Sequence, residues 1–534
     1  MKLSFFGADQ CVTGSCHCVE ANGKKILIDC GLQQGRDEID NGALPFAANT
    51  VDCVLITHAH IDHSGRVPML VKQGFDGKIV TTRLTADLLR IMLQDSAHIQ
   101  ESDAEWKSRK AKRSGGAAVE PLYTVADAVR TVDMITACEY NEPIDLYPGI
   151  TAEFVDAGHL LGSACIILTV TEGGETRKIV FSGDLGNIQQ PIIRDPSFIT
   201  GADYVVMEST YGDRNHGEGW SYTDDLARII DDTIARGGNV IIPSFAVGRT
   251  QELLYFMREI KDAGMVKSNP DFPVYIDSPL AREATEIFVG DLRGYLDEDA
   301  LELVADGTHM FNFSNLRMTA SADDSKALNT DATPKVIISA SGMCDAGRIR
   351  HHLKHNLWRP ECTVVFVGYQ GEGTLGRHLL EGARSVKLFG EEIAVRARLV
   401  NYNGLSSHAD RDHLIGWVQG FTEQKPRHIF VVHGDREVAP YFAKTLNEMG
   451  YDAHAPQYTE EYDLITCTQL KVGYLPERKS RGFEGAPKSS SAYQRLVAVG
   501  QLMTEFIRRS KGRDNKTLAK FADQLKALLD KWEA

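Results

Sequence analysis

Long apolar segments are missing from this sequence. None of its uncharged apolar runs reaches the ~18–20 residues that a membrane-spanning helix needs. The first residues, MKLSFFGADQ, lack the apolar core of a secretory signal peptide and begin directly with a strand-like pattern. We therefore expect a cytoplasmic protein that has no contact with a membrane.

Closely spaced cysteines are also scarce. The ten cysteines are scattered singly, and the only close pair is Cys16 and Cys18. Small secreted domains that depend on disulfides carry cysteines at a much higher density. We expect buried thiols that stay reduced in the cytosol and pack as small apolar side chains.

An excess of positive charge is absent as well. The formal net charge is −15, and phosphate binding needs positive charge, so the whole chain argues mildly against a nucleic-acid partner. A local basic patch or bound metal cations can reverse the sign locally. One basic run, 107-KSRKAKR-113, ends a predicted helix and is either a solvated helix end or a contact for an anionic substrate.

The composition is otherwise that of a globular protein with several domains. Hydrophobic residues make up 43% and charged residues 25% of the chain. The length corresponds to two to four domains at roughly 150 residues each. Short strands and a long helix from about residue 86 precede a region, from about residue 204, where apolar strands alternate with helices. That alternation indicates a parallel sheet, so we predict an α/β core interrupted by an inserted α/β domain.

The C-terminal segment has a different pattern. A linker-like stretch, 485-GAPKSSSA-492, is followed by two helical patterns. In the second, apolar residues recur every three or four positions, at Leu518, Phe521, Leu525, Leu528 and Trp532. This stripe packs either on the body of the protein or on a second subunit, which would make a homodimer.

Ligand-type residues are concentrated after one apolar strand, in 54-VLITHAHIDHSGRVP-68. Histidine and carboxylate side chains are ligands that Zn²⁺ prefers. His58 and His60 can converge on one metal, whereas Asp62 and His63 lie one turn further on and can face a second. Burying these polar groups without a partner costs roughly 1–3 kcal/mol each. The run therefore predicts a metal site.

One turn cannot complete two coordination spheres, so other strand ends must contribute. The same context, an apolar strand followed by His or Asp and Gly, occurs in 154-FVDAGHLLGSA-164, 179-IVFSGDLGN-187, 430-FVVHGD-435 and 26-ILIDCG-31. These segments offer His159, Asp184, His433 and Asp29 as further candidates.

The sequence resembles the metallo-β-lactamase superfamily and, within it, the β-CASP branch of RNA-processing nucleases. Besides the histidine run, the resemblance depends on 207-MESTYGDR-214, 244-SFAVGRTQE-252, 338-ISASGMCDAGR-348, 403-NGLSSHAD-410 and 432-VHGD-435. It implies an αββα sandwich at 1–205 and 391–480, a β-CASP α/β domain inserted at 206–390, and a helical tail at 488–534.

The resemblance also implies roles for individual residues. Two Zn²⁺ ions are expected, with one held by His58, His60 and His159, the other by Asp62, His63 and His433, and Asp184 bridging both. Asp29 would orient the metal ligands without binding a metal itself. His408 would be the general acid and Glu208 its acidic partner. A histidine at position 433 is typical of RNA-directed members, so the resemblance favours RNA.

Two neighbouring metal ions suit the hydrolysis of a phosphodiester. They lower the pKa of a bound water to about 7, which supplies hydroxide for in-line attack, and they neutralise charge on the phosphate. The leaving sugar oxygen then needs a proton, which an imidazole can give near neutral pH. We expect a ribonuclease that acts on single-stranded RNA and leaves a 5′-phosphate and a 3′-hydroxyl.

The inserted domain offers candidates for binding RNA phosphates. The loop 339-SASGMCDAGR-348 follows a strand and begins a predicted helix, where backbone N–H groups can approach an anion. By resemblance Ser341, Gly342 and Arg348 would contact phosphate. Arg249 and Arg377 are further candidates, each with an equally plausible structural role.

Other functions stay open at this point. A DNA-directed nuclease would use the same ligands, and a small thioester would suit the same fold without the inserted domain. Endonucleolytic and exonucleolytic cleavage share these residues, and further RNA-processing partners would supply sequence preference.

Overall fold

The computed structural model describes residues 1–34, 41–113, 115–217, 222–319, 321–371, 373–402, 406–476 and 515–533. The chain divides into two units, Met1–Lys479 and Ser480–Ala534. The predicted linker at 485–492 and the helical pattern directly after it lie outside the described residues. No helix among the described residues is both long enough and apolar enough to cross a bilayer.

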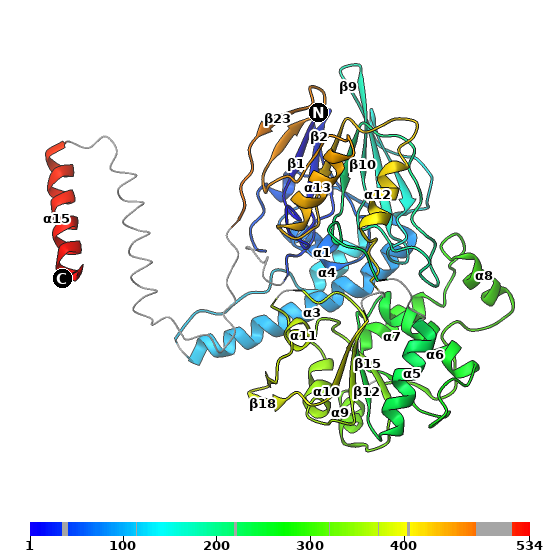
Figure 1. Cartoon of the computed structure of the whole chain (residues 1–534). Coiled ribbons are helices and arrows are strands. Elements are labelled where there is room, and N and C mark those ends of the chain that lie inside the picture. Colours follow the sequence, from blue (N-terminus) through cyan, green and yellow to red (C-terminus); the bar gives the residue numbers. More distant parts are fainter. Residues whose placement is uncertain are drawn as a thin grey trace. The chain divides into compact units, whose positions relative to one another are not determined.

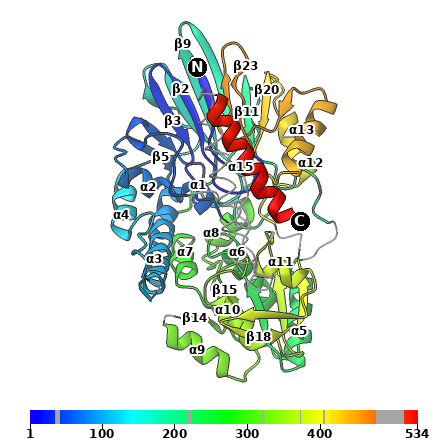
Figure 2. The ribbon, with the colours of Figure 1, turned by 90° about the vertical axis from the view of Figure 1, so that its left-hand side faces the viewer.

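Two packed sheets form one end of unit 1 (Figures 1 and 2). In the described residues the first sheet has the order β23-β22-β1-β2-β3-β4-β5-β6 and the second β21-β20-β11-β10-β9-β8-β7. The first consists of β1 Lys2–Phe5, β2 His17–Ala21, β3 Lys24–Ile28, β4 Cys53–Leu55, β5 Lys78–Thr82, β6 Ile135–Cys138, β22 Glu461–Asp463 and β23 Thr468–Lys471. The second consists of β7 Ile144–Tyr147, β8 Ile150–Asp156, β9 Ala164–Glu172, β10 Glu175–Phe181, β11 Tyr204–Met207, β20 His428–Val431 and β21 Ala453–His454.

The strands alternate their side chains between two cores. In β3, Ile26 and Ile28 face the core between the sheets, whereas Leu27 belongs to a different core. In β11, Tyr204 and Val206 face the same central core, whereas Val205 and Met207 belong to the core on the opposite face of the sheet. This period of two is what buries both faces of a strand.

Helices cover the outer faces of both sheets. One side carries η2 Ala48–Thr50, α1 Ile61–Ser64, α2 Val67–Lys72, α3 Arg83–Arg113 and α4 Val125–Asp133, and the other α12 Arg411–Gln419 and α13 Val438–Glu448. The result is a four-layered αββα arrangement. A capping box in which Thr124 and Asp127 satisfy each other's backbone N–H groups starts α4.

A third sheet lies at the other end of unit 1 (Figure 2). Its order is β14-β13-β15-β12-β16-β19, and all of its described pairings are parallel. Its strands are β12 Val240–Pro243, β13 Val274–Ile276, β14 Leu316–Met318, β15 Val336–Ser339, β16 Thr363–Phe366 and β19 Arg398–Asn401, beside a hairpin of β17 Ser385–Leu388 and β18 Glu391–Ala394. Its helices are α5 Tyr222–Ala235, α6 Arg249–Asp262, α7 Pro279–Ile287, α8 Glu298–Ala305, α9 Ala322–Thr330, α10 Ile349–Asn356 and α11 Leu375–Leu380.

The predicted α/β fold, a sandwich interrupted by an inserted α/β domain, is confirmed. The domain boundaries stay predictions. β19 lies beyond the predicted boundary at residue 390 and pairs with β16, so the third sheet uses residues on both sides of that boundary. In the second unit, the described part of the tail is the single helix α15, Asn515–Glu533. Its residues Leu518, Phe521 and Leu525 are each half-buried.

Candidate metal centre and active site

The histidine run lies in a tight turn after the buried strand β4. Asp29, at the end of neighbouring β3, fixes this turn by accepting hydrogen bonds from the Thr57 N–H at 2.8 Å and the Thr57 hydroxyl at 2.9 Å. His60 then precedes α1, which contains Asp62 and His63. Both Asp29 and His433 have left-handed backbone, with φ of 62° and 47°. Such conformations cost of order 1–3 kcal/mol and cluster at functional sites.

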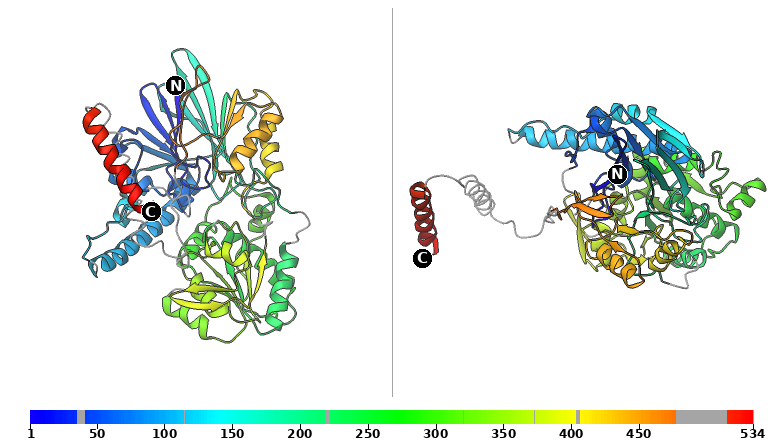
Figure 3. Two further views of the ribbon diagram at one scale, coloured as in Figure 1. Left: turned by 60° about the vertical axis from the view of Figure 1, so that its left-hand side comes forward. Right: turned by 90° about the horizontal axis from the view of Figure 1, so that it is seen from above.

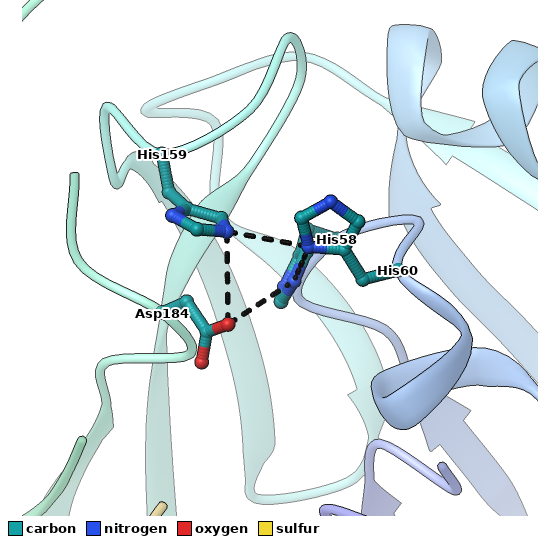
Figure 4. Close-up of side chains that lie close together, drawn as sticks. All are labelled: His58, His60, His159 and Asp184. Carbon is teal, nitrogen blue, oxygen red and sulfur yellow. Dashed lines mark hydrogen bonds and ion pairs between the residues drawn. The ribbon is translucent and has the colours of Figure 1, made fainter. Parts of the chain in front are cut away.

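Four of the predicted ligands converge on one point (Figure 4). His58 Nε2 lies 3.1 Å from His60 Nδ1, and His159 Nε2 lies 3.3 Å from the same atom. Asp184 Oδ2 lies 3.5 Å from His58 Nε2 and 3.6 Å from His159 Nε2. The sequence places these residues after three different strands, β4, β8 and β10, and the fold brings their ligand atoms together.

A second group lies on the other side of Asp184. His433 Nε2 is 3.5 Å from Asp62 Oδ2 and 3.5 Å from Asp184 Oδ1. His63 Nε2 is 3.2 Å from the same Asp184 oxygen. One carboxylate therefore presents Oδ2 to the first group and Oδ1 to the second.

Both groups have the dimensions of a zinc site. Four ligands at 2.0–2.1 Å in a tetrahedron lie about 3.3 Å from one another, close to the spacings within each group. Asp184 Oδ1 and His433 Nε2 are buried without a hydrogen-bond partner of suitable geometry. Buried polar atoms of native proteins are nearly always satisfied, so these two atoms fit metal ligands.

Hydrogen bonds select the nitrogen that each imidazole presents. His63 Nδ1 lies 2.7 Å from Asp29 Oδ2, and His159 Nδ1 lies 3.1 Å from the Ser407 carbonyl oxygen. Both partners can only accept, so Nδ1 carries the proton and the lone pair is on Nε2. Thr57 and Thr210 hold Nδ1 of His58 and His433 at 3.0 and 3.1 Å. These four imidazoles thus direct Nε2 to the clusters.

The electrostatics of the site also favour metal binding. Burial lowers the pKa of His58 and of His159 well below the ordinary value, which keeps their lone pairs available. Burial raises the pKa of Asp184, but His433, His63 and His58 more than offset this and hold it well below its ordinary value. The Asp184 carboxylate is therefore charged at neutral pH.

His408 and Glu208 form a third group beside the first. His408 Nδ1 lies 3.0 and 3.2 Å from the two Glu208 oxygens, and His408 Nε2 lies 4.0 Å from Asp184 Oδ2. Glu208 is fully buried and accepts from the backbone N–H groups of Leu185 at 2.7 Å and Thr210 at 3.1 Å. Burial lowers the pKa of His408, but Glu208, followed by Asp184 and Asp62, raises it to about 9. His408 is thus a protonated donor at neutral pH.

The predicted phosphate contacts lie in a separate region. Ser341 and Gly342 form part of the loop after β15, where Ser341 Oγ donates to the Ala346 carbonyl oxygen at 3.2 Å. Three arginines have acidic partners, since Arg348 Nη1 lies 2.7 Å from Asp277 Oδ1, Arg377 pairs with Glu381 at 2.7 Å, and buried Arg249 pairs with Glu252.

Sequence reasoning missed the side chains that support this site. Thr57 and Thr210 lie inside two of the quoted motifs, directly before His58 and two positions after Glu208, and that placement was the available signal. Tyr369, after β16, hydrogen-bonds Asp435 Oδ2 at 3.2 Å, and its ring lies 6.2 Å from that of Tyr211. This contact brings the carboxyl end of the third sheet next to the His433 loop.

Three family descriptions match successive parts of the chain. Residues 10–232 match the metallo-beta-lactamase superfamily, 250–379 the Beta-Casp domain, and 392–456 the Zn-dependent metallo-hydrolase RNA specificity domain. Ribonuclease TTHA0252 of Thermus thermophilus is 36% identical over 461 residues, which cover 86% of this chain and 99% of that protein. The chain belongs to the β-CASP branch of the metallo-β-lactamase superfamily.

Other β-CASP relatives extend the likeness to archaea. An RNase J-like protein of Methanocaldococcus jannaschii is 30% identical over 448 residues, covering 83% of this chain and 95% of that protein. Transcription termination factor FttA of Methanosarcina mazei is 29% identical over 460 residues, covering 84% of this chain and 69% of that protein. This chain is therefore a metal-dependent hydrolase of the β-CASP branch, with clustered ligands for divalent metal.

Proposed function

We propose that this protein is a zinc-dependent ribonuclease that hydrolyses single-stranded RNA and leaves a 5′-phosphate and a 3′-hydroxyl. The observation that carries the proposal is one carboxylate, Asp184, shared between two ligand groups beside the pair of half-buried His408 and buried Glu208. The names of two similar proteins, one a ribonuclease and the other an RNase J-like protein, support RNA as the substrate. A cytoplasmic location follows from that substrate and belongs to the same proposal.

Each cluster would hold one Zn²⁺ ion. His58, His60 and His159 would bind the first, and Asp62, His63 and His433 the second, with Asp184 contributing to both. Bound ions would supply charge neutralisation at the phosphate and an activated water. Nitrogen and oxygen ligands at tetrahedral spacing support zinc over Mg²⁺, which prefers oxygen ligands in an octahedron.

His408 would act as the general acid. The attacking water would give up one proton to solvent and form a bond to phosphorus, the bond to the 3′-oxygen would break, and that oxygen would take the proton from His408 Nε2. Glu208 holds the opposite nitrogen, so it orients the ring and keeps the proton on it until it is needed. His408 would then be recharged from solvent.

The loop at 339–348 would contact RNA phosphates through Ser341, Gly342 and Arg348. Arg348 uses Nη1 for Asp277, and a guanidinium has five N–H donors, so donors remain for a phosphate. Arg249 and Arg377 are weaker parts of this proposal because both already pair with a glutamate. We also propose that the domains end at residues 205, 390 and 480. The helical tail would bind a second subunit or an RNA-processing partner.

Product analysis on metal-defined protein tests the function. The purified protein is expected to carry about two zinc ions and to cut single-stranded RNA labelled at either end into fragments with 5′-phosphate termini. Protein that carries zinc but cuts only DNA or a thioester would overturn the proposal. Labelling both ends also separates endonucleolytic from exonucleolytic cleavage, and sedimentation gives the number of subunits.

A further inference from the structure

The second half of helix α3 is an unusual surface feature. α3 begins beside the loop of His159, because the hydroxyls of Thr82 and Thr85 donate to the Gly162 carbonyl oxygen at 2.6 and 2.8 Å. Its 31 residues extend for about 46 Å. Up to Ala97 it buries a regular apolar stripe, but in the remainder, residues 98–113, only Ala104 is buried. We call these residues the α3 arm; Figures 1 and 3 show it projecting from the rest of unit 1.

The tip of the α3 arm is strongly basic. Its cations are Lys107, Arg109, Lys110, Lys112 and Arg113, and all five side chains are exposed. No acidic residue lies among them, and within the described ranges none has a carboxylate within 4.0 Å. One or two cations suffice to complement the dipole at a helix C-terminus. Like charges three or four positions apart destabilise a helix, and only Lys107 and Arg109 have an acidic residue, Asp103 or Glu105, four positions before them. The basic charge of the tip is therefore not explained by the stability of α3.

An exposed aromatic ring accompanies this charge. Trp106 is 57% exposed, and Lys110 Nζ lies 5.3 Å from the centre of its ring. Trp106, Lys110 and Arg113 follow one another at spacings of four and three, which places them on one face of the helix. Aromatic rings interleaved with cations are the surface on which proteins bind single-stranded nucleic acid.

We propose that the α3 arm is a docking site for single-stranded RNA, remote from the metal clusters, where Trp106 stacks on a base and the cations contact phosphates. This proposal rests on the proposed function, because it takes the same substrate strand. A stacked strand advances about 3.4 Å per nucleotide, so about 14 nucleotides span the length of α3. The α3 arm therefore favours long RNA over short RNA.

Paired charge reversals test the proposal. We compare Lys110→Glu/Arg113→Glu with Lys326→Glu/Lys444→Glu, which reverses two exposed lysines on α9 and α13 and changes the net charge equally. Binding of labelled RNAs of about 5 and about 30 nucleotides is measured by fluorescence anisotropy over a range of salt, in a His408→Ala background that does not cut. Circular dichroism verifies that each variant is folded.

The α3 arm variant is expected to bind the long RNA about tenfold more weakly and to reduce the slope of log affinity against log salt by about 1.4, at about 0.7 per lost phosphate contact. Trp106→Ala should weaken long-RNA binding at least about fivefold through lost stacking. Neither should alter binding of the short RNA, and neither should alter cleavage of the short RNA when the same substitutions are made in protein that retains His408.

Equal long-RNA binding by the α3 arm and control variants would overturn the proposal, and so would equal losses on both RNA lengths. If the α3 arm variant instead changes only the sedimentation coefficient, the surface is a subunit contact and the RNA assignment is wrong. Failure of the proposed function is a different result, since RNA would then bind through the α3 arm without being cut by the wild-type protein.

Discussion

At the residue scale, single acceptors decide which nitrogen each histidine offers. Asp29 is nearly fully buried, and its carboxylate accepts hydrogen bonds from the His63 Nδ1–H and from the Thr57 N–H and hydroxyl. Removing the charge but keeping the shape would weaken the orientation of His63 without opening a cavity. Residues in this position typically account for 10–100-fold in metal affinity.

Asp29→Asn is therefore expected to lower zinc affinity by about 10–100-fold at the group containing His63. Competition with a chromophoric chelator measures this affinity. Asp76→Asn, at an exposed turn, is the matched control and should bind zinc like the wild type. Unchanged zinc affinity in Asp29→Asn would contradict the role of the carboxylate.

His408→Ala should reduce kcat by about 10²–10⁴-fold, the usual contribution of a general acid, while the zinc content stays the same. Steady-state cleavage of labelled RNA and metal analysis of the same sample measure both. His413→Gln, on the same segment and paired with Asp410, is the control. Loss of zinc together with activity would identify His408 as a ligand instead.

Glu208→Gln tests the proton on His408. Burial lowers the pKa of His408 and the Glu208 charge does most to raise it to about 9, so removing that charge lowers the pKa. Activity that needs the protonated ring falls as pH rises through this pKa. The alkaline limb of the kcat profile should therefore move to lower pH; a limb that stays in place would indicate a different acid.

All seven side chains in the two ligand groups were predictable because they follow apolar strands; they are His58, His60, Asp62, His63, His159, Asp184 and His433. The acceptors of Nδ1 were not. One of them is the Ser407 backbone carbonyl, which any residue could supply. The partners of the candidate arginines were also hidden, since Arg348 and Asp277 are 71 positions apart along the chain.

At the element scale, the loops of the site approach each other through their backbones. A Cβ on Gly186 would lie 1.7 Å from the Gly158 carbonyl oxygen and 2.7 Å from the His159 N–H. Gly186 also bridges to His408 in antiparallel fashion. One residue without a side chain therefore sets the separation between the His159 loop and the His408 segment.

Gly186→Ala must displace one of these loops, because the added Cβ would meet backbone atoms of Gly158 and His159, which cannot rotate away as a side chain can. We expect a fall in the melting temperature of several degrees, corresponding to about 1–3 kcal/mol, and weaker zinc binding. Gly416→Ala in α12 is the control; nothing lies within 4 Å of the added Cβ, and its melting temperature should not fall. Calorimetry with and without zinc compares the two.

Individual elements were predictable where a buried strand or a regular helix imposes its own period. The predicted long helix from about residue 86 corresponds to α3, and the βαβ rhythm after residue 204 corresponds to the third sheet. Strand order was not predictable. β11 pairs with β20, although more than 200 residues separate them, because sheet membership depends on long-range packing that no local pattern encodes.

At the scale of the whole molecule, the ligand-type residues come from both of the sheets that pack against each other through the central apolar core. His58, His60, Asp62 and His63 come from the first sheet, and His159, Asp184 and His433 from the second. Metal bound by the folded chain and not by the unfolded chain stabilises the fold by mass action.

Chelation should therefore lower the melting temperature of the wild-type protein. Because Asp184 contributes to both groups, Asp184→Ala should melt at a lower temperature and show little further effect of chelator. Differential scanning fluorimetry with and without EDTA measures this, and His408→Ala, which keeps all the ligands, should respond like the wild type. If EDTA left the melting temperature of the wild-type protein unchanged, that result would contradict zinc binding by residues of the two sheets.

The position of β20 has a consequence for biosynthesis. β20 lies between β11 and β21 in the second sheet, but the residues of the third sheet are translated before it. Domains tend to fold in the order in which they leave the ribosome. A nascent chain can therefore build the first ligand group and the third sheet while it still lacks His433 and His408. Under the proposed function, a chain still on the ribosome is therefore incomplete as a nuclease until synthesis has passed His433.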